Sequence, residues 1–285
     1  MPVQTIDSLG PLRMVVDTLR DSGTVALVPT MGALHEGHLA LVREAKRRAD
    51  HVAASIFVNP RQFGEGEDLE AYPRRLKEDA ALLEKEGVAL LWAPTPEAMY
   101  PNGYATNISV SGVSEGLCGG DRPGHFDGVA TVVCKLFSQV RPDMAFFGEK
   151  DWQQLAVIRR MARDLDLVRP HVDAIHGVPT VREKDGLAMS SRNAYLSGEE
   201  REQAAALPRA MQAAIAVMKQ GGDPPKVLAG LREALLDSGF SEVDYAELRD
   251  AETLEPLSRV GTRPTRLLVA ARIGPARLID NMAIG

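Results

Sequence analysis

The sequence predicts an α/β protein with a parallel sheet in an N-terminal domain, residues 1–180, and a smaller α+β C-terminal domain, residues 181–285. Three observations support this prediction. Short apolar runs alternate with amphipathic helical segments up to about residue 180, as in right-handed βαβ units. Polar residues follow several of these runs, where an open parallel sheet binds its ligands. Beyond Pro179 the pattern changes to an Ala-rich helical stretch followed by strand-like runs.

The first domain begins with a helical segment at 11–22 and an apolar run at 25–28, which we expect to be a buried parallel strand. A turn follows, and Leu39, Val42 and Ala45 then recur at helical spacing. The remaining expected elements are strands at 52–58, 88–92, 145–147 and 172–175, helices at 74–86, 128–140 and 151–165, a loop at 61–72, and a short exposed strand at 107–111.

The second domain is expected to combine helices and strands. Residues 186–193 form a Gly-led polar loop near the domain boundary, and loops of this kind often close over a ligand. The expected elements are helices at 199–219 and 226–238, joined by a turn at 221–225, and strands at 243–248, 266–271 and 277–282.

Composition limits the classes of function. An apolar content of 45% and a charged content of 25% are typical of a globular protein. A net charge of −6 argues against a general nucleic-acid binder. Cys118 and Cys134 lack metal or redox spacing and are expected to be free thiols. We find neither a signal peptide pattern nor a membrane-spanning apolar run, so we expect a cytoplasmic protein without membrane partners.

The turn after the first strand carries two histidines, His35 and His38, with Gly37 between them. On a first helical turn this spacing places both rings on one side, beside backbone N–H groups that attract anions. The pattern therefore predicts a receptor for a phosphate chain. A simpler interpretation is that the histidines are only surface residues or helix-capping residues. A metal site is less favoured, because no third ligand follows at helical spacing.

Polar residues after other strands offer further binding groups. Gly148-Glu149-Lys150-Asp151 combines a turn, a cation for phosphate and a helix cap, although a capped helix with a solvated lysine is an alternative. In the later loop at 186–193, Ser190-Ser191-Arg192 offers hydroxyls and a guanidinium for phosphate oxygens, or is a plain surface loop. Asn59 and Gln62 follow the second expected strand, and residues 148–151 follow a later one. Because the carboxyl ends of parallel strands share one sheet edge, we expect these residues to converge with the histidines.

Amide and carboxylate side chains complete the candidate site. Gln62 and Gln154 can both donate and accept, which suits a substrate with hydroxyl and carboxylate groups, unless they are solvated surface residues. Residues 122–126 form a polar loop that either lines the site or is a turn. Glu78 and Asp79 offer carboxylates for magnesium, but a solvated helix face is the interpretation we favour.

Five motifs occur along the chain: P-T-M-G-A-L-H-E-G-H at 29–38, F-V-N-P-R-Q-F at 57–63, R-P-G-H-F at 122–126, F-F-G-E-K-D at 146–151 and D-G-L-A-M-S-S-R-N at 185–193. Together they resemble the pantothenate synthetase family, within the nucleotidylyltransferase superfamily with its His-x-Gly-His signature. Cys118 stands where this family is expected to have an acidic residue, and we assign it no role.

The resemblance implies a Rossmann-like N-terminal domain, a C-terminal domain with a mobile Met-Ser-Ser-Arg loop, a homodimer, and ATP with Mg²⁺ as cosubstrate; the magnesium ligands stay open. Gln62 would contact pantoate and β-alanine, and Gln154 pantoate. The implied catalytic residues are His38, His35, Lys150 and Arg192. The implied ATP-binding residues are Met31, Gly32, Ala33, Leu34, His35, Glu36, Gly37, His38, Gly148, Glu149, Lys150, Asp151, Val181, Met189, Ser190, Ser191 and Arg192.

The implied reaction is the condensation of pantoate with β-alanine to give pantothenate, for coenzyme A biosynthesis. The carboxylate is first activated as pantoyl adenylate with release of pyrophosphate, and the amine then displaces AMP. Two other readings stay open. A nucleotidylyltransferase would transfer AMP to a phosphate-bearing acceptor without an amine, and a nucleotide sensor would bind ATP without turnover. A tRNA synthetase is disfavoured, because the chain lacks a basic tRNA-binding extension.

Overall fold

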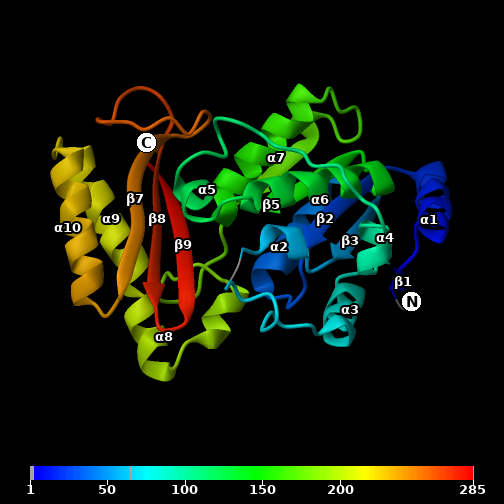
Figure 1. Ribbon diagram of the computed structural model, residues 1–285, viewed down its shortest axis with the longest axis horizontal. Helices are drawn as coiled ribbons and strands as arrows, with labels where there is room; N and C mark the ends of the chain where they lie inside the picture. Colours follow the sequence, from blue (N-terminus) through cyan, green and yellow to red (C-terminus); the bar gives the residue numbers. More distant parts are fainter. Residues whose placement is uncertain (1–2, 65, 285) are drawn as a thin grey trace.

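Two sheets organise the computed structural model, which describes residues 3–64 and 66–284 (Figure 1). The first sheet has six parallel strands in the order β1-β4-β3-β2-β5-β6. The predicted α/β fold class is therefore confirmed. The strands are β1 (Gln4–Ile6), β2 (Val25–Thr30), β3 (His51–Ile56), β4 (Leu90–Trp92), β5 (Met144–Gly148) and β6 (Ile175–Val178).

Helices cover both faces of this sheet (Figure 1). Successive residues of a strand point to opposite faces, so Val25 and Leu27 pack with α1, α6 and α7, whereas Ala26 and Val28 pack with α2 and α3. The helical elements are α1 (Leu9–Ser22), α2 (Glu36–Arg48), η1 (Pro60–Gln62), α3 (Leu76–Lys85), α4 (Pro96–Met99), α5 (Leu117–Asp121), α6 (His125–Val140), η2 (Glu149–Asp151), α7 (Trp152–Asp164) and η3 (Val172–Ala174).

The second sheet is antiparallel, in the order β7-β8-β9. One face packs on α9 and α10, and the other places Tyr245, Leu268 and Ala270 in the core of the first sheet. The two sheets fall on either side of the predicted boundary at 180 and 181, which stays a prediction. The elements here are η4 (Ser191–Tyr195), α8 (Gly198–Ala204), α9 (Ala206–Lys219), α10 (Pro224–Asp237), β7 (Glu242–Asp250), β8 (Thr265–Ile273) and β9 (Ala276–Ile284).

Three predicted elements differ from the structure. Residues 107–111 do not form a strand; Ile108 N–H instead donates to the Thr131 hydroxyl at 2.9 Å. The predicted strand at 172–175 begins only at Ile175, after η3. The predicted helix at 199–219 breaks at Ala205, because Pro208 has no N–H to continue the hydrogen-bond ladder through that turn.

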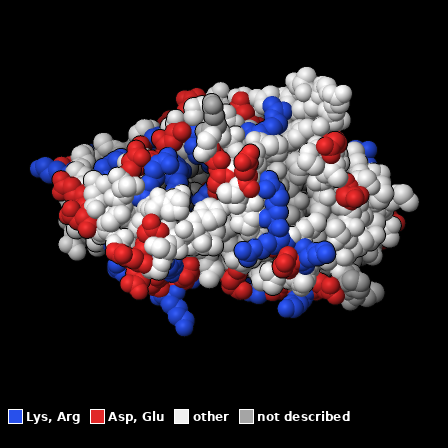
Figure 2. Space-filling view, turned by 60° about the horizontal axis from the view of Figure 1, so that its bottom comes forward, with Lys and Arg blue, Asp and Glu red and all other residues white. Residues whose placement is uncertain are grey.

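Some features lie outside the predictions. The short elements β1, α4 and α5 were not predicted, because they span only three to five residues each. Residues 1–2, 65 and 285, which fall within the predicted domains and the 61–72 loop, lie outside the described residues. Within the part of the chain described, no helix is long and apolar enough to cross a membrane. On the face shown in Figure 2, basic and acidic side chains are interspersed.

Candidate active site

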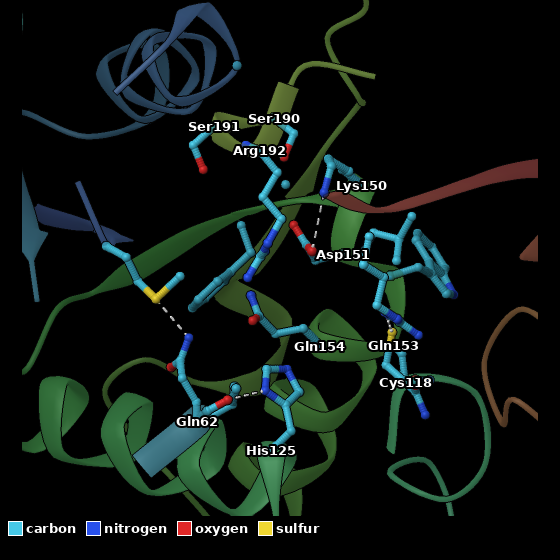
Figure 3. Close-up of a pocket in the computed structure, with 18 of the residues that line it drawn as sticks. Gln62, Cys118, His125, Lys150, Asp151, Gln153, Gln154, Ser190, Ser191 and Arg192 are labelled. Carbon is cyan, nitrogen blue, oxygen red and sulfur yellow. Dashed lines mark hydrogen bonds and ion pairs between the residues drawn. The ribbon is translucent and has the colours of Figure 1, made fainter. Parts of the chain in front are cut away.

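A cavity of about 660 Å³ lies between the carboxyl ends of the parallel strands and the C-terminal sheet. Met31 follows β2 into its lining, Gln62 follows β3, Lys150 follows β5, and Val181 follows β6. Asn281 of β9 lines it from the other sheet. The predicted convergence of these segments at one sheet edge is thus present in the structure. Figure 3 shows the Ser190–Arg192 segment and Lys150 on one side of this cavity and Gln62 and His125 on the other.

The two histidines both cap α2 and line the cavity. His35 Nδ1 accepts from the Gly37 N–H at 3.2 Å, and His38 Nδ1 accepts from the His35 N–H at 3.3 Å. Since each Nδ1 accepts, each neutral ring carries its proton on Nε2. A Cβ at Gly37 would lie 2.9 Å from the His35 ring, so only glycine fits there without a shift. The capping alternative is therefore correct, and it leaves both rings facing the cavity.

Burial keeps both rings uncharged. Burial lowers the pKa of His38 to about 3, and the neighbouring His35 and Lys150 act in the same direction. Burial also lowers the pKa of His35, again with a contribution from Lys150. At neutral pH the pair therefore offers N–H donors without positive charge, which is the arrangement that stabilises charge developing on an oxyanion.

The turn before α2 is fixed by a carboxylate far away in the sequence. Asp79 of α3 is only 2% exposed, and its two oxygens accept from Ala33 N–H at 2.9 Å and Leu34 N–H at 2.8 Å. The expectation of a solvated helix face is wrong for Asp79. These two hydrogen bonds fix the backbone of the turn, and their N–H groups are therefore not available to a ligand.

Five predicted ATP-binding residues do not line the cavity, and their assignment stays a prediction. Glu36 forms an ion pair with Arg43 on the surface of α2. Glu149 forms an ion pair with Arg266 of β8 at 3.1 Å. Gly32, with φ +88°, and Ala33, with φ +51°, form the turn itself. The five residues are Gly32, Ala33, Leu34, Glu36 and Glu149.

The other predicted residues lie on the cavity. They are Met31, His35, Gly37, His38, Gln62, Gly148, Lys150, Asp151, Gln154, Val181, Met189, Ser190, Ser191 and Arg192.

Gln62 is held by its own backbone as well as its side chain. It is 8% exposed, and its side-chain amide contacts Met31 Sδ at 2.8 Å. Its carbonyl oxygen accepts from His125 Nδ1 at 2.7 Å and from Arg122 at 3.2 Å. Burial lowers the pKa of His125 to about 4, with a contribution from Arg122, so this ring is a neutral donor. The polar loop at 122–126 therefore supports the glutamine, a role the sequence left open.

Six apolar side chains also line the cavity and are called here the apolar wall. Four of its six side chains belong to α6, within the helix predicted at 128–140. The sequence pattern gives them no role in a site, because core packing and ligand packing produce the same pattern. The wall consists of Phe57, Val129, Val132, Val133, Leu136 and Phe147.

The two predicted cations have acidic neighbours. Lys150 Nζ lies 3.6 Å from Asp151, and Arg192 donates to Asp68 at 2.9 Å. Among the described residues there is no group of three or more His, Cys, Asp or Glu that would hold a metal ion by itself. Asp151 lines the cavity with its carboxylate 44% exposed. One carboxylate suits a Mg²⁺ ion that is held mainly by nucleotide phosphates.

A parallel sheet with neutral imidazole donors and two cations at its carboxyl edge defines a nucleotide-binding α/β enzyme. The chain belongs to the pantoate-beta-alanine ligase family, whose model matches residues 4–283. The family resemblance stated from the motifs is confirmed.

Relatives and solved structures agree with this membership. The chain is 71% identical over 284 residues to the pantothenate synthetase of Novosphingobium aromaticivorans, with 99% of each chain covered. The crystal structure of pantothenate synthetase from Thermus thermophilus matches with a TM-score of 0.92 at 49% identity, covering 99% of each chain. A pantoate-beta-alanine ligase from Francisella tularensis, complexed with beta-gamma ATP and beta-alanine, matches with a TM-score of 0.82 at 31% identity, covering 99% of this chain and 97% of that one.

Proposed function

We propose that the protein condenses (R)-pantoate with β-alanine to pantothenate in an ATP-dependent reaction, through a pantoyl adenylate. Membership of the pantoate-beta-alanine ligase family over nearly the whole chain supports this activity. One structural observation carries it: the lining of a single cavity combines two histidines, a lysine and an arginine, which suit phosphates, with an apolar wall and two glutamines. This combination suits a branched hydroxy acid held beside a nucleotide.

Pantoate is assigned to the glutamine side of the cavity. The amides of Gln62 and Gln154 meet its hydroxyl and carboxylate groups, because an amide both donates and accepts. The apolar wall takes the two methyl groups of the substrate. Gln62 also contacts β-alanine, whose amine must reach the activated carboxyl carbon.

In the first step, a pantoate carboxylate oxygen bonds to the α-phosphorus of ATP, and the bond from that phosphorus to the bridging oxygen breaks. Pyrophosphate leaves with the electron pair. His38 and His35 donate through Nε2–H, and Lys150 and Arg192 supply positive charge as charge develops around the α-phosphate. In the second step, the β-alanine nitrogen attacks the acyl carbon and AMP leaves. The chain need not form a covalent intermediate.

The remaining assignments follow the same cavity. Besides the four catalytic residues, ATP contacts other residues of the cavity lining: Met31, Gly37, Gly148, Asp151, Val181, and Met189 to Ser191. Mg²⁺ enters with ATP, where it neutralises phosphate charge. Closure of the 186–193 loop keeps water from the adenylate. The protein works in the cytoplasm as a homodimer, with residues 1–180 and 181–285 as its two domains.

The test is the release of pyrophosphate and AMP from ATP with Mg²⁺ and pantoate, with and without β-alanine. We expect sustained AMP release only with both substrates, and at most one equivalent of pyrophosphate with pantoate alone. Sustained pyrophosphate release with a phosphate-bearing acceptor, and none with pantoate, would instead indicate a nucleotidylyltransferase. ATP binding without any turnover would indicate a nucleotide sensor.

A further inference from the structure

The η2 segment that carries Lys150 is held from the C-terminal sheet by one buried side chain. Asn281 of β9 is 3% exposed. Its side-chain amide donates to the carbonyl oxygens of Glu149, at 2.8 Å, and Lys150, at 2.9 Å. These carbonyls belong to the two peptide units on either side of the Lys150 Cα. Fixing both units fixes the direction in which the lysine side chain leaves the backbone.

The orientation of the Asn281 amide is itself determined. Its Oδ1 accepts from the guanidinium of Arg266, which can only donate, so the NH₂ group must face the two carbonyls. The Asn281 backbone N–H donates to the Asp280 carboxylate at 2.7 Å. Both NH₂ hydrogens and the amide oxygen are therefore engaged within the protein. Although Asn281 lines the cavity, its amide has no donor left for a substrate.

Arg266 holds the same segment from a second direction. Its guanidinium stacks on the ring of Trp152 at 3.4 Å from the centroid and forms an ion pair with Glu149 at 3.1 Å. Burial lowers the pKa of Arg266, and the Glu149 charge opposes this shift. The C-terminal sheet thus contacts the backbone of η2, the side chain of Glu149, and the ring of Trp152 at the start of α7.

We propose that Asn281 is a positioning residue for Lys150 in adenylate formation. The inference rests on the proposed function, in which Lys150 stabilises charge at the α-phosphate. Asn281 acts through the lysine and does not touch the reacting atoms. Since a displacement of about 1 Å at a charged group costs on the order of 10² in rate, two hydrogen bonds at this position have a measurable effect on the first step.

The test is Asn281→Asp, which keeps the shape and the acceptor for Arg266 but removes both donors to the carbonyls. We expect the single-turnover rate of pyrophosphate release to fall about tenfold or more, while the Kd of pantoate changes less than about twofold. In a Lys150→Ala background, Asn281→Asp should cause no further loss. This non-additivity separates a positioning role from general damage to the fold.

The matched control is Thr265→Val. Thr265 lies on β8, is 2% exposed, and donates its hydroxyl to the carbonyl of Arg263, which lies outside η2, at 2.8 Å. It disturbs the same sheet and should leave the rate of pyrophosphate release unchanged. Should Asn281→Asp not fold, Asn281→Ser carries the same test, because one hydroxyl cannot donate to both carbonyls.

Two results would overturn the inference while leaving the proposed function intact: a wild-type rate for folded Asn281→Asp, or an equal loss in the Lys150→Ala background. A wild-type rate for Lys150→Ala itself would remove the role proposed for the lysine, and the inference with it. Thermal unfolding of each variant verifies that the compared proteins are folded.

Discussion

The guanidinium of Arg192 and the carboxylate of Asp68 lie 2.9 Å apart and join η4 to the loop after η1 across the cavity that both residues line. Tyr195 adds a contact to Asp68 at 3.5 Å, and Tyr72 lies 3.5 Å from Ser191. A carboxylate of the chain itself therefore pairs with the guanidinium that we assign to the phosphates. In the proposed function, ATP competes with Asp68 for this guanidinium.

We expect Asp68→Asn to tighten ATP binding by a factor of about 1.4 to 5, because a partly exposed ion pair contributes about 0.2–1 kcal/mol and ATP no longer has to compete with it. Titration with a non-hydrolysable ATP analogue measures this effect. Asp164→Asn is the control: it makes the same charge change at a surface pair with Arg160 on α7. Unchanged or weaker binding by Asp68→Asn would contradict the prediction.

His38→Ala should lower adenylate formation by about 10² or more, with the fold intact, because a preorganised donor is lost. Lys150→Ala should have a similar effect. Since the pKa of His38 is about 3, its ring stays neutral from pH 6 to pH 9, and the pH profile of pyrophosphate release should carry no inflection from it. Near-normal turnover of both variants would rule out the catalytic assignment.

Asp79→Asn should destabilise the protein by about 1–3 kcal/mol, because one of the two backbone N–H groups then faces a donor. ATP binding should weaken as well, since the turn before His35 loses its support. Urea unfolding measures the first effect. Glu78→Gln, at the exposed neighbouring position of α3, should change the free energy of unfolding by less than about 0.5 kcal/mol. Equal effects at the two positions would argue against the proposed support.

Gly128→Ala should raise the KM for pantoate about tenfold and leave the KM for ATP nearly unchanged. A Cβ at Gly128 of α6 would lie 2.2 Å from the Arg61 carbonyl oxygen and 2.7 Å from the Gln62 nitrogen, so η1 must move with its glutamine. A displacement of this kind at a substrate-binding group costs on the order of 10 to 10² in efficiency. Gly230→Ala in α10 meets nothing within 4 Å and serves as the control. Steady-state kinetics measures both KM values. Equal changes in the KM for pantoate and the KM for ATP would contradict the prediction.

Stability should rise with pH between about 4 and 6.5. Burial lowers the pKa of His125 to about 4, below the value of about 6.5 in the unfolded chain. In this window the unfolded chain binds more protons, so the free energy of unfolding increases by up to about 1.4 kcal/mol per pH unit for this group and levels off above 6.5. Urea unfolding at pH 5 and pH 7 should show a smaller difference for His125→Asn than for wild type. Identical differences would show that His125 does not titrate on unfolding.

The local sequence pattern was sufficient to predict the strands and helices that carry the motifs. The run at 25–28 is apolar at every position and ends in a turn, so β2 and the start of α2 followed from local pattern. Contacts between distant segments were not predictable in this way. Asp79 looked like an exposed helix residue because nothing local reveals its two hydrogen bonds to a turn 45 and 46 residues away. The alternation at 107–111 imitates a strand, yet the structure pairs Ile108 with the Thr131 side chain.

The break in the helix near Ala205, unlike these contacts, could have been predicted from the local sequence. Pro208 stands in the middle of the predicted helix, and a proline there removes one hydrogen bond of the ladder. The Ala-rich composition on both sides hid the break. In the site, Asn281 shows no motif signal at all, because its partners are 131 and 132 residues away and are backbone atoms.

The contacts that β8 and β9 make with η2 and the start of α7 have a consequence for protein engineering. Chimeras that exchange C-terminal segments between relatives are usually cut at a domain boundary, which keeps each core whole. Here such a cut separates Arg266 and Asn281 from Glu149, Lys150 and Trp152. A functional hybrid must inherit both halves of this contact from one parent, so the unit of exchange is the contact and not the domain.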